Sequence, residues 1–280
     1  MDANTSGSYN SAFGRDALGA NTIGAKNTAV GAYSLDANIG GTSNTAVGYE
    51  SLTANTAGAD NVAVGKNALK TNTTGSFNVG MGNHSLFTNT SGINNTALGD
   101  GALYYNTTSN NNTAVGFYAL VNNSTGHSNT AIGANAISAN TGSHYNTAVG
   151  YDSQKLTTGS GNVSLGALTL DANTTGSNNI AIGGHALGGN TTASNNVAIG
   201  VEALFSSTEG DKNVAVGVAS LYSNVASYNT ASGSESLKAN TSGADNSAHG
   251  YRAMYSNTSG ASNIAVGKDA LKANTTGSKN

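Results

Sequence analysis

The 280-residue chain has no cysteine, no proline and no tryptophan, and only 9% of its residues are charged. Without cysteine there is no disulfide framework and no thiolate ligand for a metal or a catalytic step. Eleven Lys and Arg residues against 14 Asp and Glu residues give a net charge of −3, so the sequence offers no basic surface for nucleic acid. No apolar run approaches the roughly 18 residues of a membrane-spanning helix. We therefore expect neither nucleic-acid binding nor membrane insertion.

Large side chains are also scarce, since the chain has 38 glycines but only 5 phenylalanines and 12 tyrosines. A conventional globule of this length would have a poor hydrophobic core. The low charge argues equally against an ordinary charged disordered chain. Something other than a large core must hold the chain together.

A repeat that covers the whole chain answers this need. The motif Asn-x-Ala-x-Gly starts at Asn10 and returns every 17 residues, except that the repeats beginning at Asn146 and Asn213 have 16. The consensus is Asn-Thr-Ala-Val-Gly-x-x-Ala-Leu-x-x-Asn-Thr-Thr-Gly-Ser-x, whose positions we number 1 to 17. Position 1 is Asn and position 5 is Gly in all sixteen repeats. Such fixed places mean that every repeat occupies the same environment.

The composition of one repeat predicts β-structure. Gly, Asn, Thr and Ser favour turns and caps over helix interiors. The apolar residues form two short stretches, Thr/Val-Ala-Val and Ala-Leu, which we interpret as two short strands joined by corners at Gly of position 5 and at Asn-Thr-Thr-Gly. We predict an all-β, single-domain parallel β-solenoid, or β-roll, of sixteen rungs over residues 1–280, in which each rung is one repeat.

Stacked rungs place equivalent residues in ladders. We expect rung-to-rung amide bonds at position 1, facing apolar core ladders at positions 4 and 9, and glycine corners at position 5 that exclude a Cβ. An aspartate in place of Val115 would then bury an unpaired charge and destabilise the chain strongly. The ladder residues of four well-matched rungs are Asn44, Asn61, Asn95 and Asn112 at position 1, Val47, Val64, Leu98 and Val115 at position 4, Gly48, Gly65, Gly99 and Gly116 at position 5, and Leu52, Leu69, Leu103 and Leu120 at position 9.

Runs such as Asn44-Thr-Ala-Val-Gly48 and Asn179-Ile-Ala-Ile-Gly183 resemble the head repeats of trimeric autotransporter adhesins. They look even more like the repeats of bacterial and phage tail-fibre proteins. The resemblance covers nearly the whole chain and implies a left-handed β-roll that assembles as a homotrimer. The repeat of the adhesin heads is shorter than the one here, and the extra residues fall most naturally in the Asn-Thr-Thr-Gly corner.

The resemblance implies a structural or adhesive fibre segment, extracellular, on a cell surface or in a virion fibre, with a host-surface glycan or protein as its receptor. No capping repeat is visible at Met1 or Asn280, so we expect a segment of a longer fibre or end-to-end stacking of identical chains. We expect no catalysis and no cofactor, because no carboxylate pair recurs at a fixed place and no nucleophile motif occurs.

Two other functions remain open. Aromatic residues at the variable positions 6 and 10 suggest a carbohydrate-binding, lectin-like protein. Threonine at position 2 of many rungs suggests an ice-binding array, which valine, isoleucine and serine interrupt in other rungs. His127 and His144 lie one rung apart at position 16 but have no third metal ligand. His249 and Ser232 form a polar pair in what we predict to be a core ladder.

Overall fold

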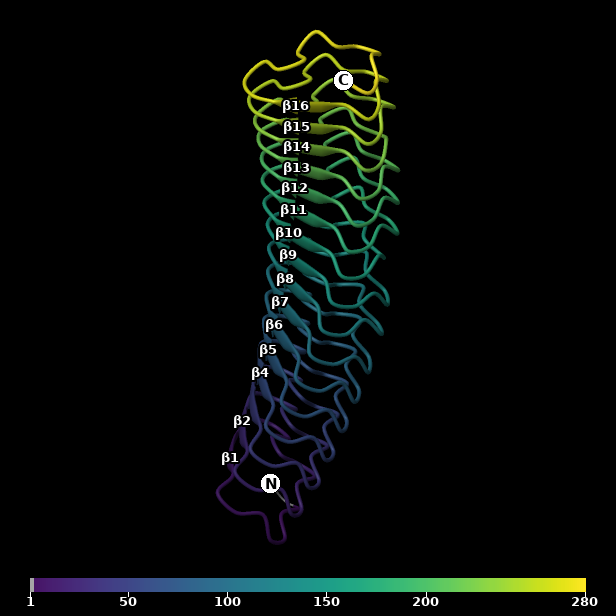
Figure 1. Ribbon diagram of the computed structural model, residues 1–280. Coiled ribbons are helices and arrows are strands. Elements are labelled where there is room, and N and C mark those ends of the chain that lie inside the picture. The colour runs from purple at the N-terminus through teal and green to yellow at the C-terminus, as the bar shows by residue number, and fades with distance from the viewer. Residues whose placement is uncertain (1–2) are drawn as a thin grey trace. The chain divides into compact units, whose positions relative to one another are not determined.

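The computed structural model describes residues 3–280. They form an all-β parallel solenoid with repeats of about 17 residues, and the described part of the chain contains no helix. This confirms the fold class predicted from the repeat. The chain comprises two compact units, one up to His144 and one from Tyr145 onward. Within each unit the strands are stacked in chain order, and looping segments return from each strand to the next (Figure 1).

Every strand has three residues and occupies positions 2 to 4 of its repeat. The strands of the first unit are β1 (Ser11–Phe13), β2 (Thr28–Val30), β3 (Thr45–Val47), β4 (Val62–Val64), β5 (Val79–Met81), β6 (Thr96–Leu98), β7 (Thr113–Val115) and β8 (Thr130–Ile132). Those of the second unit are β9 (Thr147–Val149), β10 (Val163–Leu165), β11 (Ile180–Ile182), β12 (Val197–Ile199), β13 (Val214–Val216), β14 (Thr230–Ser232), β15 (Ser247–His249) and β16 (Ile264–Val266). Equivalent residues pair in parallel, as Val47 does with Val64.

The prediction of two strands per repeat is wrong, because the Ala-Leu stretch forms a turn. Positions 7 and 9 are both left-handed, for example Asn67 with φ 61° and Leu69 with φ 50°. This backbone turns the chain too sharply for a strand. Hydrogen bonds still run from rung to rung there, since the N–H of Leu69 donates to the carbonyl of Ser85 at 2.9 Å. The rung-to-rung bonding therefore continues beyond the short strands.

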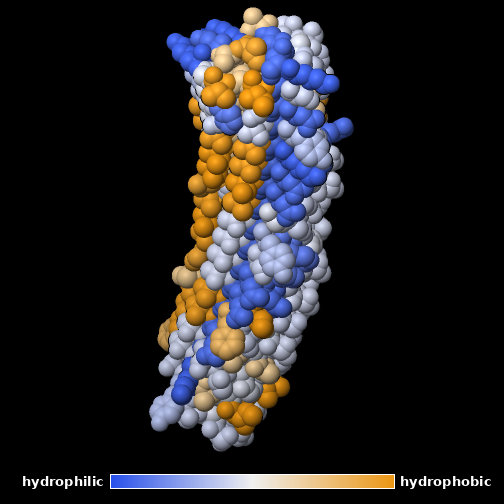
Figure 2. All heavy atoms as spheres, in the orientation of Figure 1, coloured by the Kyte–Doolittle hydropathy of each residue, from blue (hydrophilic) through white to orange (hydrophobic). Residues whose placement is uncertain are grey.

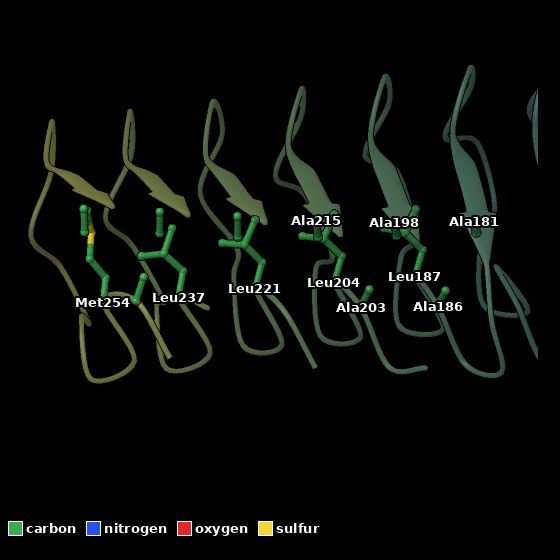
Figure 3. Close-up of a cluster of buried hydrophobic side chains, with 14 of the residues drawn as sticks. Ala181, Ala186, Leu187, Ala198, Ala203, Leu204, Ala215, Leu221, Leu237 and Met254 are labelled. Atoms are coloured by element: carbon green, nitrogen blue, oxygen red, sulfur yellow. The ribbon is translucent and has the colours of Figure 1, made fainter. Parts of the chain in front are cut away.

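The core of each unit is narrow and consists of small residues facing leucines. The alanines at position 3 of the strands between β2 and β15 are fully buried, as are the position-9 residues Leu52, Leu69, Leu103 and Leu120. In the second unit, Leu187, Leu204 and Leu221 point toward the strand alanines (Figure 3). The predicted leucine ladder is confirmed, and its partner is alanine.

The predicted core ladder at position 4 is wrong. Val47, Val64, Leu98 and Val115 are only half-buried, because side chains alternate across a strand and the alanine of position 3 takes the inward direction. Positions 2 and 4 therefore point outward together. Val115→Asp would not place a charge in the core, and the pair Ser232 and His249 lies on the outer face and not in the interior.

Candidate functional site

The asparagines of position 1 form a buried ladder, as predicted. Asn61 donates from its backbone N–H and from Nδ2 to Oδ1 of Asn44, at 3.0 and 3.1 Å. Its Nδ2 also donates to the carbonyl of Gly75 at 2.9 Å. The backbone N–H groups of Asn95 and Asn112 reach the preceding asparagine Oδ1 in the same way, each at 3.0 Å. These side chains are fully buried, so their amides are committed to the fold and not to a ligand.

A second asparagine ladder at position 12 was not predicted. Asn55 donates from Nδ2 to Oδ1 of Asn38 at 2.9 Å and to the carbonyl of Gly58 at 3.0 Å. The same carbonyl accepts Nδ2 of Asn44 at 2.8 Å, so both ladders meet at one backbone oxygen. The signal in the sequence was the near-constancy of Asn at position 12, which we interpreted as part of the Asn-Thr-Thr-Gly corner.

The glycines of position 5 form the corners that the sequence predicts. Gly48, Gly65, Gly99 and Gly116 have φ between 131° and 136°, a region open essentially to glycine alone. A Cβ on Gly65 would lie 2.6 Å from the carbonyl oxygen of Gly82 in the next rung. Backbone conformation and close approach both require glycine here.

The outward side chains at positions 2 and 4 of the strands form what we call the sheet face of each unit. No Asp, Glu, Lys or Arg occurs at these positions in β1–β16. On β10–β13 all of them are aliphatic, and Figure 2 shows them as two adjacent apolar columns. They are Val163, Leu165, Ile180, Ile182, Val197, Ile199, Val214 and Val216. Contiguous exposed apolar surface of this kind makes the sheet face a candidate interaction surface.

A second surface feature, which we call the aromatic cluster, lies in the turns after β5, β6 and β7 of the first unit. Its members are Phe87, Tyr104, Tyr105, Phe117 and Tyr118. Phe87 and Tyr104 stack with ring centroids 4.9 Å apart and an angle of 19° between the rings, and Tyr105 packs edge-on against Tyr104 at 4.6 Å. Phe117 and Tyr118 contact each other at 4.1 Å. Tyr105, Phe117 and Tyr118 are 41–51% exposed.

The aromatic cluster borders a surface cleft of about 300 Å³, lined by Tyr104, Tyr105, Tyr118 and Val121. The aromatic residues that suggested sugar binding in the sequence stand at positions 6 and 10. The cleft was not predicted, because Tyr105 stands at position 11 and Tyr118 at position 7, and these come together only across neighbouring rungs.

The two histidines at position 16 are stacked neighbours, as their spacing indicated. Their ring centroids lie 3.9 Å apart, and the N–H of His127 donates to Nδ1 of His144 at 3.1 Å. Burial, followed by the adjacent His127 ring, holds the pKa of His144 below its usual value. Within residues 3–280 no group of three or more His, Cys, Asp or Glu side chains is placed to hold a metal ion.

One rung of the second unit has a polar interior. Gln154 takes the position of the core leucine, and its Nε2 donates to the carbonyl of Thr147 and to Oγ of Ser164, both at 2.9 Å. Ser153 bonds to Ser164 at 2.6 Å and to Thr169 at 2.8 Å. Oε1 of Gln154 is buried without a hydrogen-bond partner. The cluster is closed to solvent, which makes it a core feature.

Charged side chains pair on the surface. Nζ of Lys70 lies 2.7 Å from Glu50, and Glu235 contacts both Arg252 and Lys238. Hydrogen bonds from Arg252, then from Lys238, hold the pKa of Glu235 below its usual range. Each of these carboxylates is thus kept ionised by a neighbouring cation, which is the behaviour of a surface ion pair.

No helix in the described part of the chain has the length and apolar character needed to cross a membrane. No family model matches the chain, and neither a curated protein nor a solved structure matches it.

Proposed function

We propose that this chain is a structural and adhesive fibre segment, without catalysis, that assembles as a homotrimer through its sheet face. The observation that carries the proposal is the sheet face itself. It is half-exposed, uncharged and repeated on every strand of both units. Position 4 is apolar on every strand except β14 and β15, and position 2 is aliphatic on β4, β5, β10–β13 and β16 and Thr or Ser on the other strands. The apolar part of such a face gains stability when it is covered.

A second and a third copy of the same chain fit this face better than an unrelated partner does. Within each unit the outward columns repeat at the constant spacing of the parallel rungs, so the same unit of identical chains matches rung for rung. The absence of Asp, Glu, Lys and Arg from these columns means that no like charges meet when the faces close. Valine and isoleucine side chains also lose little conformational freedom when they are covered.

The proposed setting follows from the resemblance of the repeats to adhesin heads and tail fibres. A trimeric assembly of this kind would stand outside the cell, on a bacterial surface or in a virion fibre, and present its turns to a host glycan or protein. Many weak contacts on repeated turns gain strength through multivalency. End-to-end stacking of chains would lengthen the fibre.

The test is the mass in solution, measured by light scattering during size exclusion. We expect about three times the chain mass of 27.6 kDa. Asp in place of both Val115 and Ile199, one on the sheet face of each unit, would bury charges in the trimer. The double variant should keep the β-type circular dichroism spectrum and elute as a monomer.

The control is Thr108→Asp, which places one such charge on an exposed turn and should remain trimeric. A monomeric wild-type chain would refute the trimer. A double variant that stays trimeric would show that another surface forms the contact.

A further inference from the structure

The aromatic stack of the first unit is interrupted at one rung. Position 10 carries Phe87, then Tyr104, then Val121 in three successive rungs. Phe87 and Tyr104 stack at 4.9 Å, which is close to the separation of neighbouring rungs. Val121 stands in the next rung, where a third ring would continue the stack. Its side chain is smaller than a ring and lines the cleft that remains there. A flat ligand at this place would contact the Tyr104 ring.

Two further tyrosines line the sides of the cleft. Tyr105 stands edge-on to Tyr104, and Tyr118 lines the cleft from the next rung. The Tyr118 ring lies against the backbone of Gly101, where a Cβ would come within 2.2 Å of its Cε1 atom. Gly101 therefore positions Tyr118. Other turns of the first unit carry His84 or Asn67 at this position, so the glycine is specific to the cleft.

We propose that this cleft binds a hexopyranose ring of a neutral oligosaccharide. The apolar C–H face of a pyranose packs flat on an aromatic ring, and its equatorial hydroxyls need polar groups at the edge. The hydroxyls of Tyr104, Tyr105 and Tyr118, whose residues line the cleft, can both donate and accept hydrogen bonds. The side chains of Asn83, Asp100 and Asn122 stand on the turns of the same and adjacent rungs and are exposed.

The charge around the cleft selects a neutral sugar. Residues 95–128 contain no Lys and no Arg, and Asp100 is their only carboxylate. Sialic acids, uronic acids and phosphorylated sugars carry anions, which are recognised through cationic side chains. No Lys or Arg is present in these rungs. His84 of the preceding rung has its ring centroid 6.1 Å from that of Tyr104 and its Nδ1 3.9 Å from Asp100, whose carboxylate would repel an anionic sugar.

The other ligand for an aromatic surface is a proline-rich peptide, and the geometry favours the sugar. Proline-rich peptides lie in extended grooves lined by aromatic residues. Here the cleft spans two rungs. The aromatic column at position 10 contains only Phe87 and Tyr104, because Lys70 stands in the rung before them and Val121 in the rung after them. A volume of about 300 Å³ is at the small end of ligand sites.

The cleft belongs to turn segments and not to the outward columns of the strands. It therefore does not depend on the proposed trimer, and each proposal can fail without the other. In a trimer closed through the sheet face, three clefts would be presented per fibre segment.

The experiment applies the intact chain to a glycan array that displays neutral and anionic oligosaccharides, followed by calorimetric titration of the strongest ligand. Decaproline is titrated in parallel. We expect binding to neutral hexose-containing glycans. Tyr105→Ala and Tyr118→Ala should each weaken it at least tenfold. Gly101→Ala should weaken it too, although it removes no aromatic group.

The matched control is Tyr222→Ala. Tyr222 stacks on Phe205 at 5.3 Å in the second unit, but Ser223 and Glu235 stand where Tyr105 and Tyr118 stand around the cleft. This variant should bind like the wild type. Absence of glycan binding, preference for anionic glycans, or binding that Tyr105→Ala and Tyr118→Ala leave unchanged would overturn the proposal. Decaproline binding that these variants abolish would assign the cleft to peptides.

Discussion

Some residues of each rung adopt unfavourable backbone conformations, whose cost is offset by the burial and the hydrogen bonds that the conformation allows. The buried position-9 leucines have left-handed φ values, such as 50° at Leu52, which cost about 1–2 kcal/mol each in an L-residue. Complete burial of a leucine side chain stabilises the fold by about 1.5–3 kcal/mol, and the hydrogen bond from Leu52 N–H to the carbonyl of Ala68 at 3.0 Å adds to this. The backbone cost and the gain from burial are of similar size, so the net stability of a rung comes from its hydrogen bonds and contacts with the neighbouring rungs.

Gly65→Ala should be strongly destabilising. The new Cβ would meet the carbonyl oxygen of Gly82 at 2.6 Å, at a φ of 131°. Strain of this type costs about 1–3 kcal/mol before any clash is relieved. Gly40→Ala is the control, since its Cβ would touch only Ile23 at 3.5 Å. Urea unfolding should give a large loss for the first variant and almost none for the second; equal effects would contradict the corner assignment.

Asn61→Ala should also destabilise the chain, through hydrogen bonds and not through strain. It removes the acceptor of the Asn78 N–H and a donor to the carbonyl of Gly75. A buried polar group left without its partner costs about 1–3 kcal/mol. Asn83→Ala, at an exposed turn, should change the unfolding free energy by less than about 0.5 kcal/mol. An Asn61→Ala variant as stable as wild type would show that water replaces the ladder.

At this scale the sequence predicted most of the structure, because absolute constancy at a position has few physical causes. Asn at position 1 and Gly at position 5 were assigned correctly for that reason. Val115 was misplaced because its apolar side chain fits either a core or a covered outer face. The adjacent Ala114 indicates the correct orientation, since only one of two adjacent strand residues can face inward.

At the scale of the rung, the error in the Ala-Leu stretch has a clear origin. Short apolar runs do not separate a strand from a tight turn, and leucine is an unusual residue for a left-handed conformation. The aromatic cleft lay beyond prediction for another reason. It depends on Tyr105 and Tyr118, which come from different positions of different rungs, and their place at one cleft requires the rung-to-rung offset to be known.

The rung that contains Gln154 provides a test of how the core tolerates polar residues in place of apolar ones. Gln154→Leu combined with Ser164→Ala restores the common residues and removes the unpartnered Oε1 of Gln154. We expect a gain of about 1–3 kcal/mol in the free energy of unfolding, since an unsatisfied buried group is eliminated. The reverse change in a regular rung, Leu120→Gln, should cost a similar amount. A loss of stability in the double variant would mean that the polar network is worth more than its orphaned oxygen costs.

At the scale of the molecule, the composition is explained by the repetition. Each three-residue strand and the turns after it bond to the rungs before and after, so stability grows by addition of rungs and not by enlargement of one core. Proline is absent because it lacks the N–H that such bonding requires. Low charge fits as well, since identical charges stacked at rung spacing would repel one another.

Removal of one whole rung should therefore leave the fold intact. Deletion of residues 61–77 joins Asp60 to Asn78, and it brings Val47 beside Met81, Asn44 beside Asn78 and Leu52 beside Leu86 in the places that their 17-residue neighbours now hold. Every ladder is preserved, so calorimetry should show cooperative melting with an enthalpy lower by about one-sixteenth.

Deletion of residues 61–69 alone removes about half a rung and would place Lys70 in the buried asparagine ladder. That variant should lose cooperative melting, because every following position in its rung is out of register. If both deletions melt alike, the register of the ladders does not determine stability and the rung is not the structural unit.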